Sequence, residues 1–418
     1  MIRPIKAISI ILVSLSLVSC GGLTDLQNNL PNLSLPEATN KPQDNVTLDP
    51  IAEKETLVAK QFKVAVVLPT KYNNPHNYKN TKSITGLATS MVNAIEMARK
   101  ELNEPRLSIL LYETNGTAEN VQAAAQNAVN NKVDLVLGPL LAPSVVAMRS
   151  VTEPAGVPVI AFSSDKTSVN GGFSYLLSYL IEQNVSSIVN YAMREGHIHY
   201  GALTSQSPYG TRVAETFSKE VQDRAGVVTN YVQFDPRQSD FYIRTKSFSE
   251  KDVKDGQGGK ASYSSFILSD SAPMLMRLMP ILEKYDMKLD DYLILGTGIW
   301  DDPKILSVAE LNGAVYAAPD RKTLGIFNNR FQKSYGYKPS KVASLAYDAI
   351  SLTVALIRNH NEEAFDIRNI TDPNGFSGVG GIFRFKSTGL SERGLSILKI
   401  NNGAVEEIQS APDTFIGS

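Results

Sequence analysis

The chain has 418 residues, of which 43% are hydrophobic and 20% are charged. Its 41 Lys and Arg almost balance its 42 Asp and Glu, so it lacks the basic field that holds a nucleic-acid backbone, and we expect no nucleic-acid partner. Its single cysteine excludes an intramolecular disulfide framework and a Cys-rich zinc or iron–sulfur site. At about 150 residues per domain, the length predicts two to three domains.

The single cysteine, Cys20, closes an apolar N-terminal segment. Two basic residues precede the apolar run 7–18, which has the length of a signal-peptide core and is too short to span a bilayer. The sequence LVSC at 17–20 resembles a bacterial lipobox. That resemblance implies cleavage after a signal peptide at 1–19 and lipidation of Cys20, with two or three acyl chains as a stable anchor. The alternative is an incidental cysteine in an ordinary secretory signal.

The residues after the cysteine indicate where the protein is sorted and how it is tethered. Gly21 and Gly22 follow Cys20, with no acidic residue, and this resembles the signals of outer-membrane lipoproteins. We therefore predict a lipid-anchored periplasmic protein at the outer membrane, with the inner membrane left open. Residues 20–61 contain frequent proline and few clustered apolar residues, which predicts a flexible tether.

From Phe62 onward, short apolar runs alternate with segments of helical periodicity. The first series predicts strands at 63–70, 107–112, 133–138 and 157–162, with helices at 86–102, 117–129 and 144–153 between them. Such alternation indicates right-handed βαβ crossovers and a parallel sheet covered by helices on both faces.

A second series begins near residue 184. It predicts strands at 200–204, 227–234, 264–268, 292–296 and 313–317, and helices at 185–195, 210–225, 240–250 and 272–285. A Gly- and Lys-rich stretch at 251–260 predicts an exposed loop, and a helix at 341–358 and strands at 381–385 and 395–400 complete the chain. The fold class predicted is α/β with two lobes, each a mostly parallel sheet flanked by helices. A ligand cleft would lie between the lobes, beyond the carboxyl ends of the strands.

Several short motifs carry a resemblance to a known family. They are VLGPL at 136–140, VPVIAFSS at 157–164, PYG at 208–210, AYDA at 346–349 and GFSGVGGIFRF at 375–385. In this order and spacing they resemble the type I periplasmic binding proteins of the leucine-binding group. The resemblance implies one binding protein-like domain at 62–418. Its first lobe would comprise 62–182 and 318–385, and its second lobe 183–317 and 386–418.

Within that group, the chain is similar to the penicillin-binding protein activator lipoproteins of the short form. The lipobox, the tether, LP at 68–69, LGPL at 137–140, AFSSD at 161–165 and NYA at 190–192 carry this resemblance. It implies a lipoprotein that contacts a class A penicillin-binding protein and activates its peptidoglycan synthesis. The alternative is a solute-binding receptor of an ABC importer for an amino acid or a similar small molecule.

No catalytic motif is present, so we predict no enzyme activity, no cofactor and no metal site. Gly256 to Lys260 lacks the glycine spacing of a phosphate-binding loop. His197 and His199 could hold a metal from one strand face, but a surface role is favoured. Asp301 and Asp302 could form a carboxylate pair, but a position before Pro303 favours a helix start.

Polar residues after the predicted strands are the candidates for the ligand cleft. They are Thr70, Asn115, Ser144, Ser163, Ser164 and Asp165 in the first lobe, and Ser205, Gln206, Tyr209, Ser269, Asp270 and Trp300 in the second. Hydroxyls and backbone N–H groups at such positions suit a small carboxylate ligand. The alternative is a structural role, in which Ser163 and Ser164 cap the next segment and Tyr209 opens a helix. Asp165 stands near where amino-acid binders present a threonine, which weakens the case for an amino acid.

Overall fold

The computed structural model describes residues 60–73, 78–249, 263–285, 287 and 289–415. The chain divides after Leu57 into two units, and every described residue belongs to the second. The signal peptide, Cys20, the tether and the predicted loop at 251–260 lie outside the described residues.

Lobe 1 is built on a five-stranded parallel sheet with the order β2-β1-β3-β4-β5. The strands are β1 (Phe62–Leu68), β2 (Leu107–Glu113), β3 (Leu135–Leu137), β4 (Val159–Ala161) and β5 (Ser174–Leu176). Six of the seven β1 residues are buried, because helices cover both faces of the sheet.

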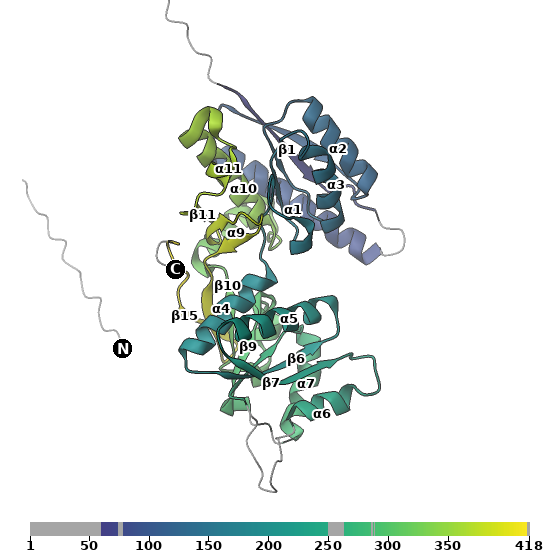
Figure 1. The fold of residues 1–418 in the computed structure, drawn as a ribbon, viewed down its shortest axis with the longest axis vertical. Helices are drawn as coiled ribbons and strands as arrows, with labels where there is room; N and C mark the ends of the chain where they lie inside the picture. The colour runs from purple at the N-terminus through teal and green to yellow at the C-terminus, as the bar shows by residue number, and fades with distance from the viewer. Residues whose placement is uncertain (1–59, 74–77, 250–262, 286, 288, 416–418) are drawn as a thin grey trace, which may run out of the picture. The chain divides into compact units, whose positions relative to one another are not determined.

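Alternate β1 side chains point to the two faces of this sheet, and helices lie on both sides of β1 (Figure 1). Val64 and Val66 join a core with α1 (Tyr78–Leu102), α9 (Arg321–Tyr335) and α10 (Ala343–His360). Ala65 and Val67 join a second core with α2 (Ala118–Asn130) and α3 (Ala142–Thr152). The predicted βαβ arrangement of lobe 1 is therefore present.

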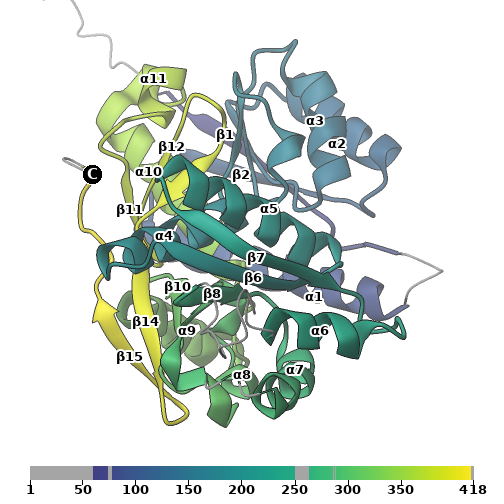
Figure 2. The ribbon, with the colours of Figure 1, turned by 60° about the horizontal axis from the view of Figure 1, so that its bottom comes forward.

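Lobe 2 is built on a seven-stranded sheet with the order β15-β14-β10-β9-β8-β6-β7. The strands are β6 (His199–Ser205), β7 (Val227–Phe234), β8 (Ser265–Leu268), β9 (Leu293–Gly296), β10 (Val315–Ala318), β14 (Ser396–Asn401) and β15 (Ala404–Gln409). All pairs are parallel except those made by β14 and β15. Helices α4 (Ile181–Arg194) and α5 (Pro208–Asp223) cover one face, and α6 (Phe241–Ser249) and α7 (Ala272–Lys284) cover the other (Figure 2).

The boundary expected near residue 385 needs a correction. In a small antiparallel sheet, β12 (Gly381–Phe385) pairs with β11 (Phe376–Gly378) and with β13 (Ser391–Arg393). Leu390 also bridges to Leu176 at the edge of the lobe 1 sheet. Residues 386–393 therefore belong with lobe 1, and the last passage to lobe 2 lies at 394–395.

Candidate functional site

The carboxyl ends of β6, β7 and β8 surround a cavity of about 540 Å³ in lobe 2. Its lining comes from the turns after these strands and after β9, as expected where parallel strands end at one edge. The lining residues are Ser205, Gln206, Ser207, Pro208, Tyr209, Asp235, Pro236, Arg237, Ser269, Asp270, Ser271, Met274 and Ile299. Five of the six second-lobe candidates are among them.

The turn from β6 into α5 forms one wall of the cavity. Ser207 caps the helix by accepting a hydrogen bond from the Gly210 N–H at 3.0 Å, and Pro208 occupies its first turn. A Cβ at Gly210 would lie 2.2 Å from the Ser205 carbonyl oxygen, so only glycine lets the helix start this close to the strand. The motif PYG thus holds Tyr209 beside the strand end, where its hydroxyl pairs with Thr297 Oγ1 at 2.7 Å.

Two polar groups of the cavity lack a full set of partners. The Asp270 Oδ2 accepts one backbone hydrogen bond, from the Ser205 N–H at 3.3 Å. No Lys or Arg of the described residues forms an ion pair with Asp270, and burial raises the pKa of its carboxyl. The Ser269 hydroxyl is buried and has no hydrogen-bond partner in the described part of the chain. Such groups are available to a bound molecule.

Asp235 and Arg237 form the outer wall of the cavity. The Asp235 carboxylate accepts hydrogen bonds from the Arg237 N–H, Nε and Nη2 at 3.0 to 3.1 Å. These bonds hold the pKa of Asp235 below its ordinary value. Asp235 is absent from the sequence-predicted candidates, although it directly follows the predicted strand 227–234 and so meets the rule that selected them.

Most of the first-lobe candidates are engaged in local hydrogen bonds. Thr70 donates to Glu113 at 2.9 Å, and the Ser144 hydroxyl donates to the Gly116 carbonyl at 3.2 Å. Asn115 accepts from the Thr117 N–H at 3.0 Å. These contacts give the three side chains a structural role, and the ligand role of all three residues stays a prediction.

The segment after β4 contains the other three first-lobe candidates. Ser163 Oγ accepts from the Asp165 N–H at 3.1 Å, and Asp165 caps the next turn by accepting from the Thr167 N–H at 3.0 Å. Those hydrogen bonds from Thr167 lower the pKa of Asp165. Ser164 between them is exposed. Of these three, Asp165 has a contact with lobe 2, since its carboxylate lies 3.8 Å from Arg212 of α5.

The position expected for Trp300 needs a correction. Its side chain is fully buried in the core of lobe 2, and its neighbour Ile299 lines the cavity instead. The indole packs under Gly296, where an added Cβ would lie 2.2 Å from the ring. Core packing therefore decides the placement of this residue.

Comparison with known proteins gives the family. The family model described as "Periplasmic binding protein" matches residues 83–404. The chain belongs to the periplasmic binding protein family. Membership places this protein outside the cytoplasm. A comparison with curated proteins gave no match.

Several solved structures have the same fold as this periplasmic binding protein. The leucine-binding protein LivK from Thermotoga maritima is 18% identical, with a TM-score of 0.54, over 84% of this chain and 99% of that one. LivJ from Streptococcus pneumoniae, in complex with isoleucine, is 15% identical, with a TM-score of 0.54, over 84% and 100%. A solute-binding protein from Rhodopseudomonas palustris, in complex with 3,4-dihydroxybenzoic acid, is 18% identical, with a TM-score of 0.55, over 84% and 96%. At these identities the likeness establishes the fold alone.

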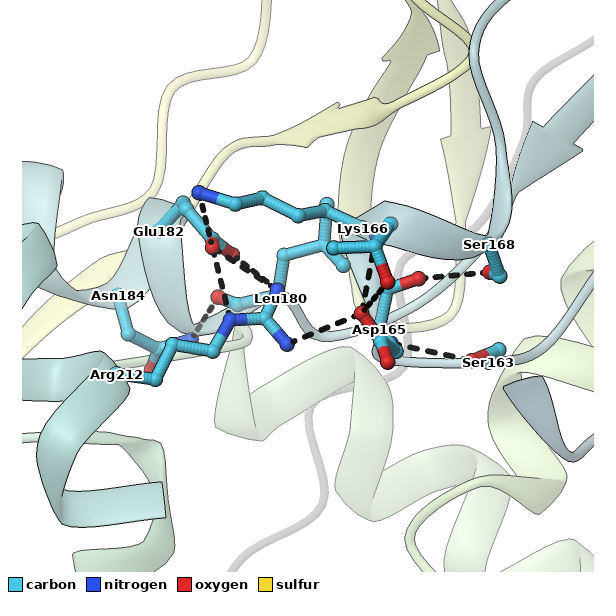
Figure 3. A network of polar contacts seen from close by, with 9 residues as sticks. Ser163, Asp165, Lys166, Ser168, Leu180, Glu182, Asn184 and Arg212 are labelled. Carbon is cyan, nitrogen blue, oxygen red and sulfur yellow. Dashed lines mark hydrogen bonds and ion pairs between the residues drawn. The ribbon is translucent and has the colours of Figure 1, made fainter. Parts of the chain in front are cut away.

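An ionic network joins the two lobes of this binding protein beside the first passage between them (Figure 3). Lys166 of lobe 1 lies 3.1 Å from Glu182 at the start of α4, and Arg212 of α5 lies 2.9 Å from the same carboxylate. Arg212 also lies 3.8 Å from Asp165. Nearby, Asn184 accepts from the Gly298 N–H at 2.8 Å. Charge pairing thus holds the carboxyl end of β4 against lobe 2.

We expect Glu182→Gln to loosen this network and to lower the free energy of unfolding at pH 7 by about 1 kcal/mol, as for a partly exposed ion pair. Burial raises the pKa of Glu182, but hydrogen bonds from the backbone, Lys166 and Arg212 outweigh it, so the net pKa is lowered. Because the pKa of Glu182 is lowered in the folded state, its stabilisation is complete above the ordinary pKa of 4.5. The stabilisation is lost as the pH falls through the folded-state pKa.

Hydrogen exchange of residues 177–184 measures this effect directly. The exchange should accelerate in Glu182→Gln at pH 7, and the difference from the wild type should shrink in acid. Glu96→Gln is the matched control, because Glu96 also has a lowered pKa but pairs with Arg99 within α1. Equal exchange in Glu182→Gln and wild type at pH 7 would contradict a role in joining the lobes.

The remaining sequence candidates lie away from the cavity. His197 pairs with Ser264 Oγ at 2.7 Å and His199 is exposed. Asp302 caps α8 (Pro303–Leu306) through the Lys304 N–H at 2.8 Å, and Asp301 pairs with Arg321 at 3.0 Å. In the described residues, no group of three or more His, Cys, Asp or Glu side chains is arranged to hold a metal ion. No helix there combines the length and apolar character needed to cross a membrane.

Proposed function

We propose that this protein is the solute-binding receptor of an ABC importer and that it holds a small polar molecule between its lobes. The observation that carries the proposal is the cavity at the carboxyl ends of β6 to β8, with its Asp270 carboxylate and its Ser269 hydroxyl, which has no hydrogen-bond partner among the described residues. The printed descriptions of the similar structures, which name leucine-binding and ABC transporter solute-binding proteins, support the same function.

A thermal-shift screen of amino acids, amines, organic acids and sugars tests the proposal. A solute present at 100 times its dissociation constant should add about 2.7 kcal/mol to the free energy of unfolding. Ser205→Ala should reduce the shift, because it removes a hydroxyl that lines the cavity and pairs with Ser207. If no solute in the screen stabilises the wild type, the receptor proposal fails.

Regulation of a class A penicillin-binding protein is the second candidate function. The sequence patterns LGPL at 137–140 and AFSSD at 161–165, which resemble the activator lipoproteins, support it. A glycan-polymerisation assay with the cognate synthase distinguishes the two candidates. A faster rate with the wild type and with Asp270→Asn would support activation through an outer surface, and an unchanged rate together with no pull-down would remove this candidate.

We also propose that Cys20 carries the lipid anchor of the protein at the outer membrane. The lipobox-like sequence at 17–20 supports this proposal. We expect Cys20→Ser to leave the protein unlipidated, and mass spectrometry of the mature N-terminus measures the change. An unmodified cysteine in the wild-type protein would contradict the anchor, and fractionation would separate the outer from the inner membrane.

A further inference from the structure

We propose that the lobe 2 cavity selects cationic solutes, with Asp270 as their counter-ion, and that it rejects solutes whose only charged group is a carboxylate. This inference rests on the proposed solute-binding function and adds the class of solute to it. It separates this chain from the relatives whose descriptions name leucine, isoleucine or an aromatic acid.

The charges that line the cavity do not balance. They comprise the carboxylates of Asp235 and Asp270 and a single cation, Arg237. Arg237 is committed to Asp235 through three hydrogen bonds, and its side chain is 86% exposed, so it extends outward from the wall. Asp270 is left with hydrogen bonds from Ser205 alone and with no cation within ion-pair distance among the described residues. A half-buried carboxylate in this state attracts a positive charge.

The groups beside Asp270 are suited to hydrogen-bond donors on the solute rather than to hydrogen-bond acceptors. An ammonium group has three hydrogen-bond donors and no acceptor, so it needs several acceptor atoms around it. The second oxygen of Asp270 and the buried Ser269 hydroxyl, which has no partner in the described chain, offer such atoms. Met274 and Ile299 add apolar surface for the hydrocarbon part of an amine.

The facing segment of lobe 1 does not supply a free cation for a solute carboxylate. The residue after the Ser163-Ser164 pair is Asp165, where the resemblance to amino-acid binders would place a threonine. The two basic side chains nearest to it, Lys166 and Arg212, are paired with Glu182. Among the described residues, this segment of lobe 1 therefore offers no unpaired cation to a solute carboxylate.

Calorimetric titration with two matched series tests the inference. The five-carbon series is cadaverine, 5-aminovalerate and glutarate, and the aromatic series is benzylamine and benzoate. We expect cadaverine to bind at least tenfold more tightly than 5-aminovalerate, benzylamine at least tenfold more tightly than benzoate, and glutarate not to bind. Asp270→Asn should lower the affinity for cadaverine at least thirtyfold. Glu215→Gln, which removes an exposed carboxylate of α5 outside the cavity, should leave the affinity unchanged.

Ser269→Ala provides a second variant that changes one buried hydroxyl and keeps the charge of the cavity. We expect Ser269→Ala to lower the affinity for cadaverine several-fold and to leave the melting temperature of the solute-free protein unchanged. Tighter binding of the anion in either series, or equal affinity of Asp270→Asn and wild type for cadaverine, would overturn the cation selectivity while leaving solute binding intact. Failure of every solute in the thermal-shift screen would instead remove the receptor function on which the inference rests.

Discussion

Arg393→Ala is expected to lower the free energy of unfolding by about 3–5 kcal/mol, the cost of leaving one partner of a buried ion pair alone. Arg393 Nη2 lies 3.1 Å from Asp348 Oδ2, and both side chains are fully buried. The second Asp348 oxygen accepts from the Val379 N–H at 2.7 Å. The guanidinium also stacks over the rings of Tyr179 and Phe383, at 4.9 and 5.0 Å, so the substitution removes packing as well as charge.

The position of the Arg393–Asp348 pair explains why its loss should affect the segments that pass between the lobes. A Cβ at Gly380 would lie 2.8 Å from the Tyr179 hydroxyl, 3.3 Å from Arg393 Nη1 and 3.6 Å from Pro319. These three neighbours belong to the three segments that pass between the lobes. The pair therefore joins the first and third passages to α10 through Tyr179 and Arg393, and its loss should accelerate hydrogen exchange in both of them.

Chemical denaturation of the variants measures the cost. Glu392→Gln is the matched control, because Glu392 pairs with Arg384 on the same hairpin but is partly exposed, and it should cost about 1 kcal/mol or less. The double variant Asp348→Leu with Arg393→Met should recover much of the stability, since it leaves no unpaired buried charge. A loss of about 1 kcal/mol or less for Arg393→Ala would contradict the argument.

Gly210→Ala is expected to destabilise the protein by about 3 kcal/mol and to abolish solute binding in the lobe 2 cavity. The new methyl carbon would lie 2.2 Å from the Ser205 carbonyl oxygen and 2.7 Å from its hydroxyl oxygen. Neither the backbone of β6 nor the start of α5 can yield without moving Tyr209 and the Ser207 cap. Thermal unfolding and a cadaverine titration measure the two effects.

Gly325→Ala is the control for this substitution. Gly325 lies inside α9, and an added Cβ would meet no atom within 4 Å. We expect it to raise stability by about 0.5–1 kcal/mol through helix propensity alone, with an unchanged affinity for solutes. Wild-type stability and affinity in Gly210→Ala would show that the turn after β6 is not constrained as described.

Hydrophobic periodicity was sufficient to predict the two lobes and most of their elements. The strand at 227–234 and the strand at 381–385 agree with the structure to the residue. The helix Arg321–Tyr335 was not predicted, because only Phe327 and Phe331 of its side chains are buried and the apolar pattern is sparse. Strands β13 and β15 were not predicted either, since both are short edge strands with few buried apolar residues.

The candidate site was predictable only in part. The rule that ligands lie beyond the carboxyl ends of strands selected Ser205, Tyr209 and Asp270, which the fold brings together. It could not show that Ile299 lines the cavity while Trp300 is buried in the core, because the orientation of a side chain after a strand depends on packing. It also could not show that Arg393 and Asp348, 45 residues apart, form a buried pair.

The most direct test of the account is methyl NMR of the methionines during a cadaverine titration. Met274 lines the cavity, and Met276 lies on the same helix but is 54% exposed and outside the lining. The account predicts a saturable shift of the Met274 methyl resonance, with Met276 unchanged and the shift absent in Asp270→Asn. A shift confined to methyl groups outside the lining would contradict binding of cadaverine in this cavity, and no shift at any cadaverine concentration would contradict the selection of cationic solutes.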